Sequence, residues 1–332
     1  MAVSELGSIA EIEAWTQEAQ RGFLGRLGRA LWSFAKKKPL GFACGIIVVF
    51  FMIVGDLVPE TVNKISKEAG LGKPVPYLAD VLADHTGFIY PFQKQDISHR
   101  LEGSSAKYLL GTDPIGRDVL SRLLYGARVA VVVSFATVFI SQAIGTTIGV
   151  ATAYYGGIVD KFIYRIVDVF QALPGLILYI TILGIFGSGL WQMVMVLGVL
   201  GGPIISRAIR GQAIQVMAMP FVESAKVVGA SDRRIMFRYV LPNVFALVIL
   251  GATLQLGVIV LLEATLSFLG YGLPPPFPSW GQMLNIEGRN NMLTQPGLAI
   301  YPGLAIGLLV FAFNLFGDAL RDVLDPRLRG SR

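Results

Sequence analysis

The sequence predicts an all-α, polytopic membrane protein with six transmembrane helices. Apolar residues make up 54% of the 332 residues and charged residues only 15%, and the mean hydropathy is +0.62. A soluble domain has about 45–50% apolar and about 25% charged residues. Apolar stretches also recur at lengths close to the roughly 20 residues that a helix needs to cross a bilayer core.

Six apolar stretches are the candidate membrane helices. In chain order they are residues 40–58, 129–153, 165–186, 190–205, 242–262 and 299–316. The fourth is the least regular, because Gly201, Gly202 and Pro203 interrupt it. Glycine and proline are tolerated in membrane helices where neighbouring helices satisfy the freed backbone groups, so we expect a helix here as well.

The first stretch is expected to stay in the mature chain. Nearly forty polar and charged residues precede it, and no small-residue cleavage site follows it, unlike the pattern of a cleavable signal peptide. The single cysteine, Cys44, lies inside this stretch and excludes an intrachain disulfide.

Basic residues predict the orientation of the helices. If the N-terminus is cytoplasmic, 18 of the 28 Lys and Arg residues fall on the inner side, and Lys36, Lys37 and Lys38 directly precede the first helix. Cytoplasmic flanks of membrane helices carry such an excess. Six spans then place both termini in the cytoplasm, and a basic face against anionic lipid accounts for the net charge of +6 without nucleic acid.

Two segments outside the apolar stretches have weaker patterns. From Ile9 to Phe34 apolar residues recur at steps of three or four, which predicts an interfacial amphipathic helix; a partly ordered tail with fortuitous spacing is the alternative. The polar residues 59–128 are expected to form an external loop region. Its histidines, His85 and His99, lack a cluster of further ligands, so we interpret them as loop residues rather than metal ligands.

Asp113 and Pro114 are expected to begin a helix within this external region. Aspartate can cap free N–H groups, and proline suits the first helical position. An amphipathic run follows as far as Arg128. We therefore expect a capped helix that lies along the outer membrane surface.

A basic, polar island separates the fourth and fifth apolar stretches. Residues 207–239 are too charged to span a membrane and too few to form a domain. Pro220 should end an incoming helix, Gly229 should form a turn, and Ser231 with Asp232 should cap a second helix. We expect a helix, a tight turn and a helix that present Phe221, Val222 and Ala225 to a partner; a solvated connector is the alternative.

Four separated motifs support a family resemblance. They are Leu-Gly-Thr-Asp at 110–113 with Gly-Arg-Asp at 116–118, the island with Glu223-Ser224-Ala225, Gly229 and Leu241-Pro242, Glu-Ala-Thr-Leu-Ser-Phe-Leu-Gly at 263–270, and Gly-Asp-Ala-Leu-Arg-Asp at 317–322 with Leu-Asp-Pro-Arg at 324–327. Their order resembles the oligopeptide/dipeptide/nickel family of ABC importer permeases, and specifically its C-type subunit, over about residues 109–329. Ser224 and Tyr239 depart from the usual loop pattern but keep a suitable size or apolarity, and residues 59–107 show no match.

The resemblance implies a type I ABC importer permease fold in a prokaryotic inner membrane. It implies a heterodimer with a homologous permease, two cytoplasmic ATPases and an external solute-binding protein. The implied ATPase-coupling residues are Phe221, Val222, Glu223, Ser224, Ala225, Gly229 and Arg233. The chain has no Gly-x-x-x-x-Gly-Lys-Ser/Thr phosphate loop, so ATP and Mg²⁺ are expected on the partner ATPases, and the chain itself is not expected to be an enzyme.

The chain is therefore expected to comprise five segments. They are a cytoplasmic amphipathic segment (1–38), the first membrane helix (39–58), the external region (59–128), a core of five helices with coupling loop 206–241 (129–317) and a cytoplasmic tail (318–332).

Polar residues in the apolar stretches are candidates for the translocation path. Asp168 either lines the path or complements a helix dipole at a first turn. Glu263 is expected to pair with an outer arginine or to contact the binding protein, pairing being favoured. Gln171 and Gln255, with Gln142 and Gln192, could bind a peptide backbone or hold helices together.

Competing functions differ in what they require. An intramembrane protease would need a catalytic pair or metal cluster at membrane depth, but no His-Glu-x-x-His motif occurs and neither histidine lies in a span. An autonomous ion-coupled carrier or channel is the rival function and would work without ATPases. Within the importer reading, di- or oligopeptides are the first choice of substrate, and nickel, glutathione and oligosaccharides are the alternatives.

Overall fold

The computed structural model describes residues 32, 34–54 and 92–324, and these contain helices but no strand, apart from an isolated bridge between Thr112 and Asp118. The predicted amphipathic N-terminal segment lies almost wholly outside the described residues. His85, most of residues 59–107 and the end of the C-terminal tail also lie outside them.

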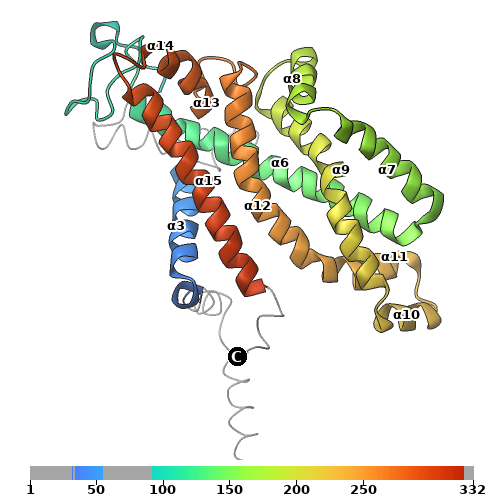
Figure 1. Ribbon diagram of the computed structural model, residues 1–332. Helices are drawn as coiled ribbons and strands as arrows, with labels where there is room; N and C mark the ends of the chain where they lie inside the picture. Colours follow the sequence, from blue (N-terminus) through green and yellow to red (C-terminus); the bar gives the residue numbers. More distant parts are fainter. Residues whose placement is uncertain (1–31, 33, 55–91, 325–332) are drawn as a thin grey trace, which may run out of the picture.

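Four long helices of the described residues are apolar enough to cross a membrane: α6 (Val119–Tyr155), α9 (Leu190–Met217), α12 (Leu241–Phe268) and α15 (Gly297–Leu324). A bent pair, α7 (Gly157–Ala172) and α8 (Gly175–Phe186), passes the same test only when counted together. The helix α3 (Pro39–Val54) is apolar but shorter. These six units correspond to the six predicted stretches, and α12, α15 and α3 can be followed from the centre to the left edge of the bundle in Figure 1.

The third predicted span, residues 165–186, is wrong as a single straight helix. The axes of α7 and α8 meet at 89° across Leu173 and Pro174. Proline lacks an N–H and pushes the preceding residue away from helical angles, and Leu173 is indeed extended with φ −88° and ψ 139°. The segment is therefore two helices joined by a sharp bend, as in a broken span or a re-entrant loop.

The helix α6 begins at Val119, and the predicted surface helix that starts at Asp113 is wrong. The Asp113 side chain is completely buried, and its Oδ1 accepts bonds from the N–H groups of Ile115 and Arg117, both at 2.9 Å. These bonds close a turn. Asp118 is the N-cap instead, because it accepts from the Ser121 N–H at 2.8 Å.

Small residues bring α6 and α9 into close contact. A Cβ atom added at Gly149 would lie 2.7 Å from the Ser206 carbonyl oxygen, and one added at Gly145 would lie 2.8 Å from the Gly202 oxygen. Membrane helices pack through such small residues because lipid supplies no hydrophobic drive to bring them together. At the other side of the bundle Gly41 of α3 fits against Ala319 of α15 in the same way.

A short helix with a π-helical middle, which we call the η3 helix, lies between α12 and α15 in the chain. It consists of α13 (Trp280–Gln282), the π-helix η3 (Met283–Gly288) and α14 (Arg289–Asn291). Trp280 is buried and donates its Nε1–H to the Leu123 carbonyl of α6 at 2.8 Å. The η3 helix thus packs on the first turns of α6 in the upper part of the molecule (Figure 1).

The island between α9 and α12 forms a separate small core. The helix α9 continues through Pro203 to Met217, so the predicted loop boundary at residue 206 is too early. Then follow α10 (Pro220–Val227), α11 (Asp232–Arg234) and the π-helix η2 (Ile235–Val240). We call residues 218–240 the coupling segment.

Candidate functional site

The coupling segment has the predicted order of helix, tight turn and helix. Pro220 is the first residue of α10, and Gly229 adopts φ +77°, a conformation that favours glycine. The turn is closed by bonds from the Gly229 N–H to the Lys226 oxygen at 2.9 Å and from the Ala230 N–H to the Ala225 oxygen at 3.0 Å. Ser231 stands at the N-cap position of α11, but its side chain makes no capping bond, so this detail of the prediction is wrong.

Val222 anchors the coupling segment instead of being presented on its surface. Its side chain is fully buried, which corrects the expectation that it contacts a partner. It belongs to an apolar cluster with residues from α6, α9, η2 and α12: Val150, Ile209, Ala213, Val216, Ile235, Val240, Val244 and Val248. This cluster joins α10 to three long helices, α6, α9 and α12.

The exposed surface of the coupling segment is apolar at its tip. Val227 and Val228 are 84% and 87% exposed. Neither valine was among the coupling residues predicted from the sequence. Phe221, Glu223, Ser224, Gly229 and Arg233 are exposed as well, and Ala225 is half-buried. Clustered apolar side chains on a polar loop indicate a protein interface.

Two polar contacts tie the coupling segment to the end of α6. The Tyr154 hydroxyl donates to Asp232 Oδ1 at 2.7 Å, and the Lys226 ammonium lies 5.9 Å from the centre of the Tyr154 ring. The π-helix η2 leads directly into α12, and such wide turns occur often at functional sites.

Asp168 lies near the C-terminal end of α7 and forms an ion pair with Arg207 of α9. The first-turn dipole interpretation is therefore wrong for Asp168; Asp160 holds that position and binds Arg210 of α9 through two bonds of 2.6 and 2.7 Å. Both arginines lie against the Tyr164 ring. Gln171, one turn further along α7, is exposed.

Gln255 and Glu263 bind within the bundle. Gln255 of α12 donates to the Ser141 hydroxyl of α6 at 3.0 Å and accepts from Gln142 at 3.2 Å, as expected of a residue that holds helices together. Glu263 is 1% exposed and accepts from the Ser267 hydroxyl at 2.7 Å. Among the described residues, Ser267 rather than an arginine binds Glu263, so the expected pairing with an outer arginine is not found there.

The outer arginines bind Glu287 of η3 instead. Arg122 and Arg117 reach the same oxygen, Glu287 Oε1, at 2.7 and 2.9 Å, and Arg117 also binds Asp113. Burial raises the pKa of the Glu287 carboxyl, and the Arg122 guanidinium lowers it. Sequence reasoning missed Glu287 because its partners lie 165 and 170 residues earlier in the chain.

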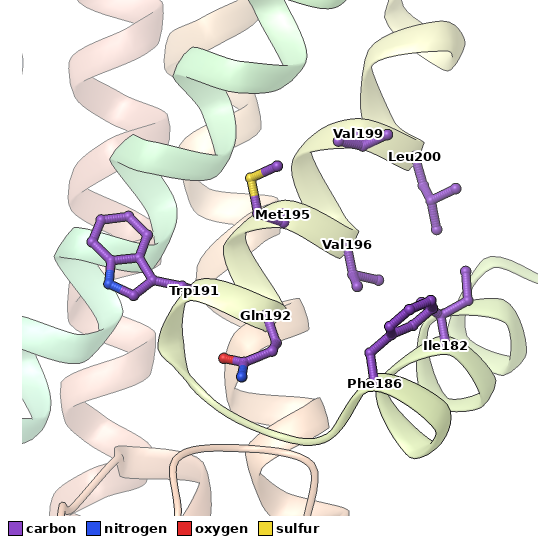
Figure 2. A pocket seen from close by; sticks show the side chains of 8 residues that line it. All are labelled: Ile182, Phe186, Trp191, Gln192, Met195, Val196, Val199 and Leu200. Carbon is purple, nitrogen blue, oxygen red and sulfur yellow. The ribbon is translucent and has the colours of Figure 1, made fainter.

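An open groove of about 590 Å³ runs between α8 and α9. Figure 2 shows Ile182 and Phe186 of α8 on one side and Val196 and Leu200 of α9 opposite them. Gln192 is the one polar side chain in its lining. The groove therefore suits an acyl chain or a neighbouring helix, and among the described residues no group of three or more His, Cys, Asp or Glu could hold a metal ion.

Comparison with known families identifies the protein family to which this chain belongs. Residues 145–330 match the family described as binding-protein-dependent transport system inner membrane component, a match that covers more than half of the chain. The chain belongs to this family. It is an ABC importer permease, as the resemblance implied, of the oligopeptide/dipeptide/nickel type.

Relatives of this permease are close in length and sequence. It is 40% identical over 245 residues to the glutathione transport system permease protein GsiD of Pectobacterium atrosepticum, which covers 73% of this chain and 81% of that protein. It is 39% identical over 253 residues to the GsiD protein of Escherichia coli, with 75% and 83% covered.

A solved structure supports the fold. The permease resembles a chain of the inward-facing MetNI methionine ABC transporter with a TM-score of 0.50 and 20% identity, over 61% of this chain and 96% of that chain. This likeness confirms the predicted type I importer permease fold, and the helices make the permease a multi-pass inner-membrane protein.

Proposed function

We propose that this ABC importer permease brings short peptides across the inner membrane by coupling ATPase motion to alternating access. The observation that carries the proposal is the coupling segment, whose exposed tip stands on a buried apolar base shared with α6, α9 and α12. A rigid knob on such a base transmits a displacement because packed cores shift as units rather than deform continuously.

Permeases of this family work with ATPase subunits and a binding protein, and we propose the full set of partners for this one. The set is a homologous permease in a heterodimer, two cytoplasmic ATPases and an external solute-binding protein. Both termini of the chain would then be cytoplasmic, with the coupling segment on the same side. ATP hydrolysis is assigned to the partners.

The substrate class follows from the relatives and from chemistry. GsiD proteins are named as glutathione permeases, and glutathione is itself a tripeptide. We therefore propose di- and oligopeptides, glutathione included, with nickel and oligosaccharides as less supported alternatives.

Two of the four path candidates keep that role in the proposal. Asp168 and Gln171 are exposed near the end of α7. Gln255 and Glu263 form the polar contacts described above within and between α6 and α12, and we assign them to helix packing.

Variants of the coupling segment test the proposal. Gly229→Pro removes the turn bond and is incompatible with φ +77°, and Glu223→Arg reverses an exposed charge on α10. Both should abolish co-purification with the ATPases and ATP-dependent uptake, while the chain still inserts in the membrane.

A matched control is Gly211→Ala on α9, where an added Cβ meets nothing within 4 Å. This variant should bind the ATPases normally. Wild-type uptake and normal ATPase binding by the two coupling variants would refute the coupling role.

A further inference from the structure

The break between α7 and α8 leaves irregular, non-helical backbone at Leu173 and Pro174. Each residue from Gln171 to Ile177 is exposed, although the bent pair is apolar enough to cross the membrane. Irregular backbone at membrane depth occurs only where protein covers it or where it lines a water-filled cavity.

The first turn of α8 offers unpaired backbone donors. The N–H groups of Gly175, Leu176 and Ile177 have no bonded partner within the described part of the chain, and Pro174 at the N-cap provides no side-chain bond. The first bond of the helix start is from the Leu178 N–H to the Pro174 oxygen at 3.2 Å. Free donors and the helix dipole together favour an anion at this end.

The Tyr179 hydroxyl points independently to the same place. The Tyr179 side chain is 9% exposed, and its oxygen would lie only 3.7 Å from a Cβ atom at Gly175, because helical side chains lean toward the N-terminus. Among the described residues this hydroxyl has no hydrogen-bond partner, and its oxygen is not one of the fully buried unpaired atoms. The oxygen of the otherwise buried side chain therefore reaches the surface beside Gly175, where a ligand can bind it.

The start of α15 has the same sequence pattern without the free donors. Pro174-Gly175 with Tyr179 corresponds to Pro296-Gly297 with Tyr301. At α15, however, the Leu298 and Ala299 N–H groups donate to the Gln295 and Pro296 oxygens, both at 3.1 Å. The pattern therefore does not create free donors by itself; the bend at Pro174 does.

Charge around the break is balanced. Asp168, one turn before Gln171, is held by Arg207, so its carboxylate does not leave a net negative charge beside the first turn of α8.

We propose that the first turn of α8 and the Tyr179 hydroxyl bind the carboxylate of the transported solute on the translocation path. This inference rests on the proposed import of peptides, each of which carries a C-terminal carboxylate. The site would hold the solute loosely between its release by the binding protein and its exit to the cytoplasm.

Thiol labelling tests whether the site is aqueous and attracts anions. In the complete transporter with Cys44→Ser, Leu176→Cys is treated with an anionic and, separately, a cationic methanethiosulfonate of similar size. Each reaction rate is divided by the rate of the same reagent with a free thiol in solution. On this scale the anionic reagent should react at least about fivefold faster than the cationic one, because the helix dipole and the free donors attract an anion. The control is Ile300→Cys, at an exposed position in the first turn of α15, and it should show no such preference.

Two labelling outcomes would overturn the inference. An absence of reaction with either reagent would mean that lipid or a partner helix covers the break, and equal or faster reaction with the cationic reagent would remove the anion site. Neither outcome depends on the transported substrate, so a failure here differs from a failure of the importer proposal.

Uptake kinetics give the second test. With labelled glutathione as the probe, Tyr179→Phe should raise KM about tenfold, the effect of losing one hydrogen bond to a charged group, and should leave kcat unchanged. Tyr301→Phe is the matched control and should leave both parameters unchanged. An unaltered KM in Tyr179→Phe contradicts the role of the hydroxyl, whereas an absence of glutathione uptake in the wild type counts against glutathione as the substrate.

Discussion

At the scale of single residues, Glu287 joins two distant parts of the permease. Its Oε1 binds both Arg122 and Arg117, and the Glu287 and Arg122 side chains are each 3% exposed. A buried pair contributes little net stability when intact but is expensive to break, because one charge then remains unpaired. The carboxylate thus holds the η3 helix on the start of α6.

Glu287→Ala is expected to lower the free energy of unfolding by about 3–5 kcal/mol, because it leaves Arg122 buried with only Asp113 nearby. Thermal unfolding in detergent measures the change. The control Asp322→Ala breaks the pair with Lys38, in which both side chains are 41% exposed, and should cost at most about 1 kcal/mol. Equal losses in the two variants would show that burial does not set the strength of the pair.

Residue patterns predicted local features and missed distant ones. Pro220 and Gly229 act within a few residues, so the helix, turn and helix of the coupling segment were predictable. The Asp118 cap and the ion pairs of Glu287 were not predictable from the sequence. Several acidic residues stand near suitable partners in the sequence, and only the fold selects among them. Val222 belongs to the motif, yet its burial depends on α6, α9 and α12.

At the scale of helices, proline had two different effects on predicted spans. Pro203 and Pro302 lie inside the continuous helices α9 and α15, whereas Pro174 separates α7 from α8 by a bend of 89°. The sequence shows a proline in each case. Packing decides the outcome: α9 is supported along its length by α6, while the residues around Pro174 are all exposed.

Close packing of α6 on α9 is the element-scale feature that a single substitution tests best. Gly149→Leu would force a side chain against the Ser206 oxygen at 2.7 Å and the Arg210 nitrogen at 3.0 Å, both backbone atoms that cannot swing away. We expect a loss of about 1–3 kcal/mol or more, measured by thermal unfolding. The control Gly211→Ala should be neutral or stabilising, because it adds a better helix former in open space; a neutral Gly149→Leu would contradict the close contact.

At the scale of the whole molecule, the helix order predicts an alternating path through the membrane. With both termini inside, the coupling segment is cytoplasmic and the η3 helix is external. Single cysteines in a Cys44→Ser background should therefore react from the inside at Ser231, which is exposed, and from the outside at Ser104, also exposed. Reaction of Ser231→Cys from the outside would reverse the topology.

The central claim is that this chain is one part of an ATP-driven machine rather than a carrier in itself. The direct measurement is uptake of labelled short peptides and glutathione into liposomes that contain the purified chain, with and without a homologous permease, two ATPases, the binding protein and ATP. We predict uptake only when all partners and ATP are present. Robust flux through the chain alone, driven by an ion gradient, would contradict the account and identify an autonomous carrier.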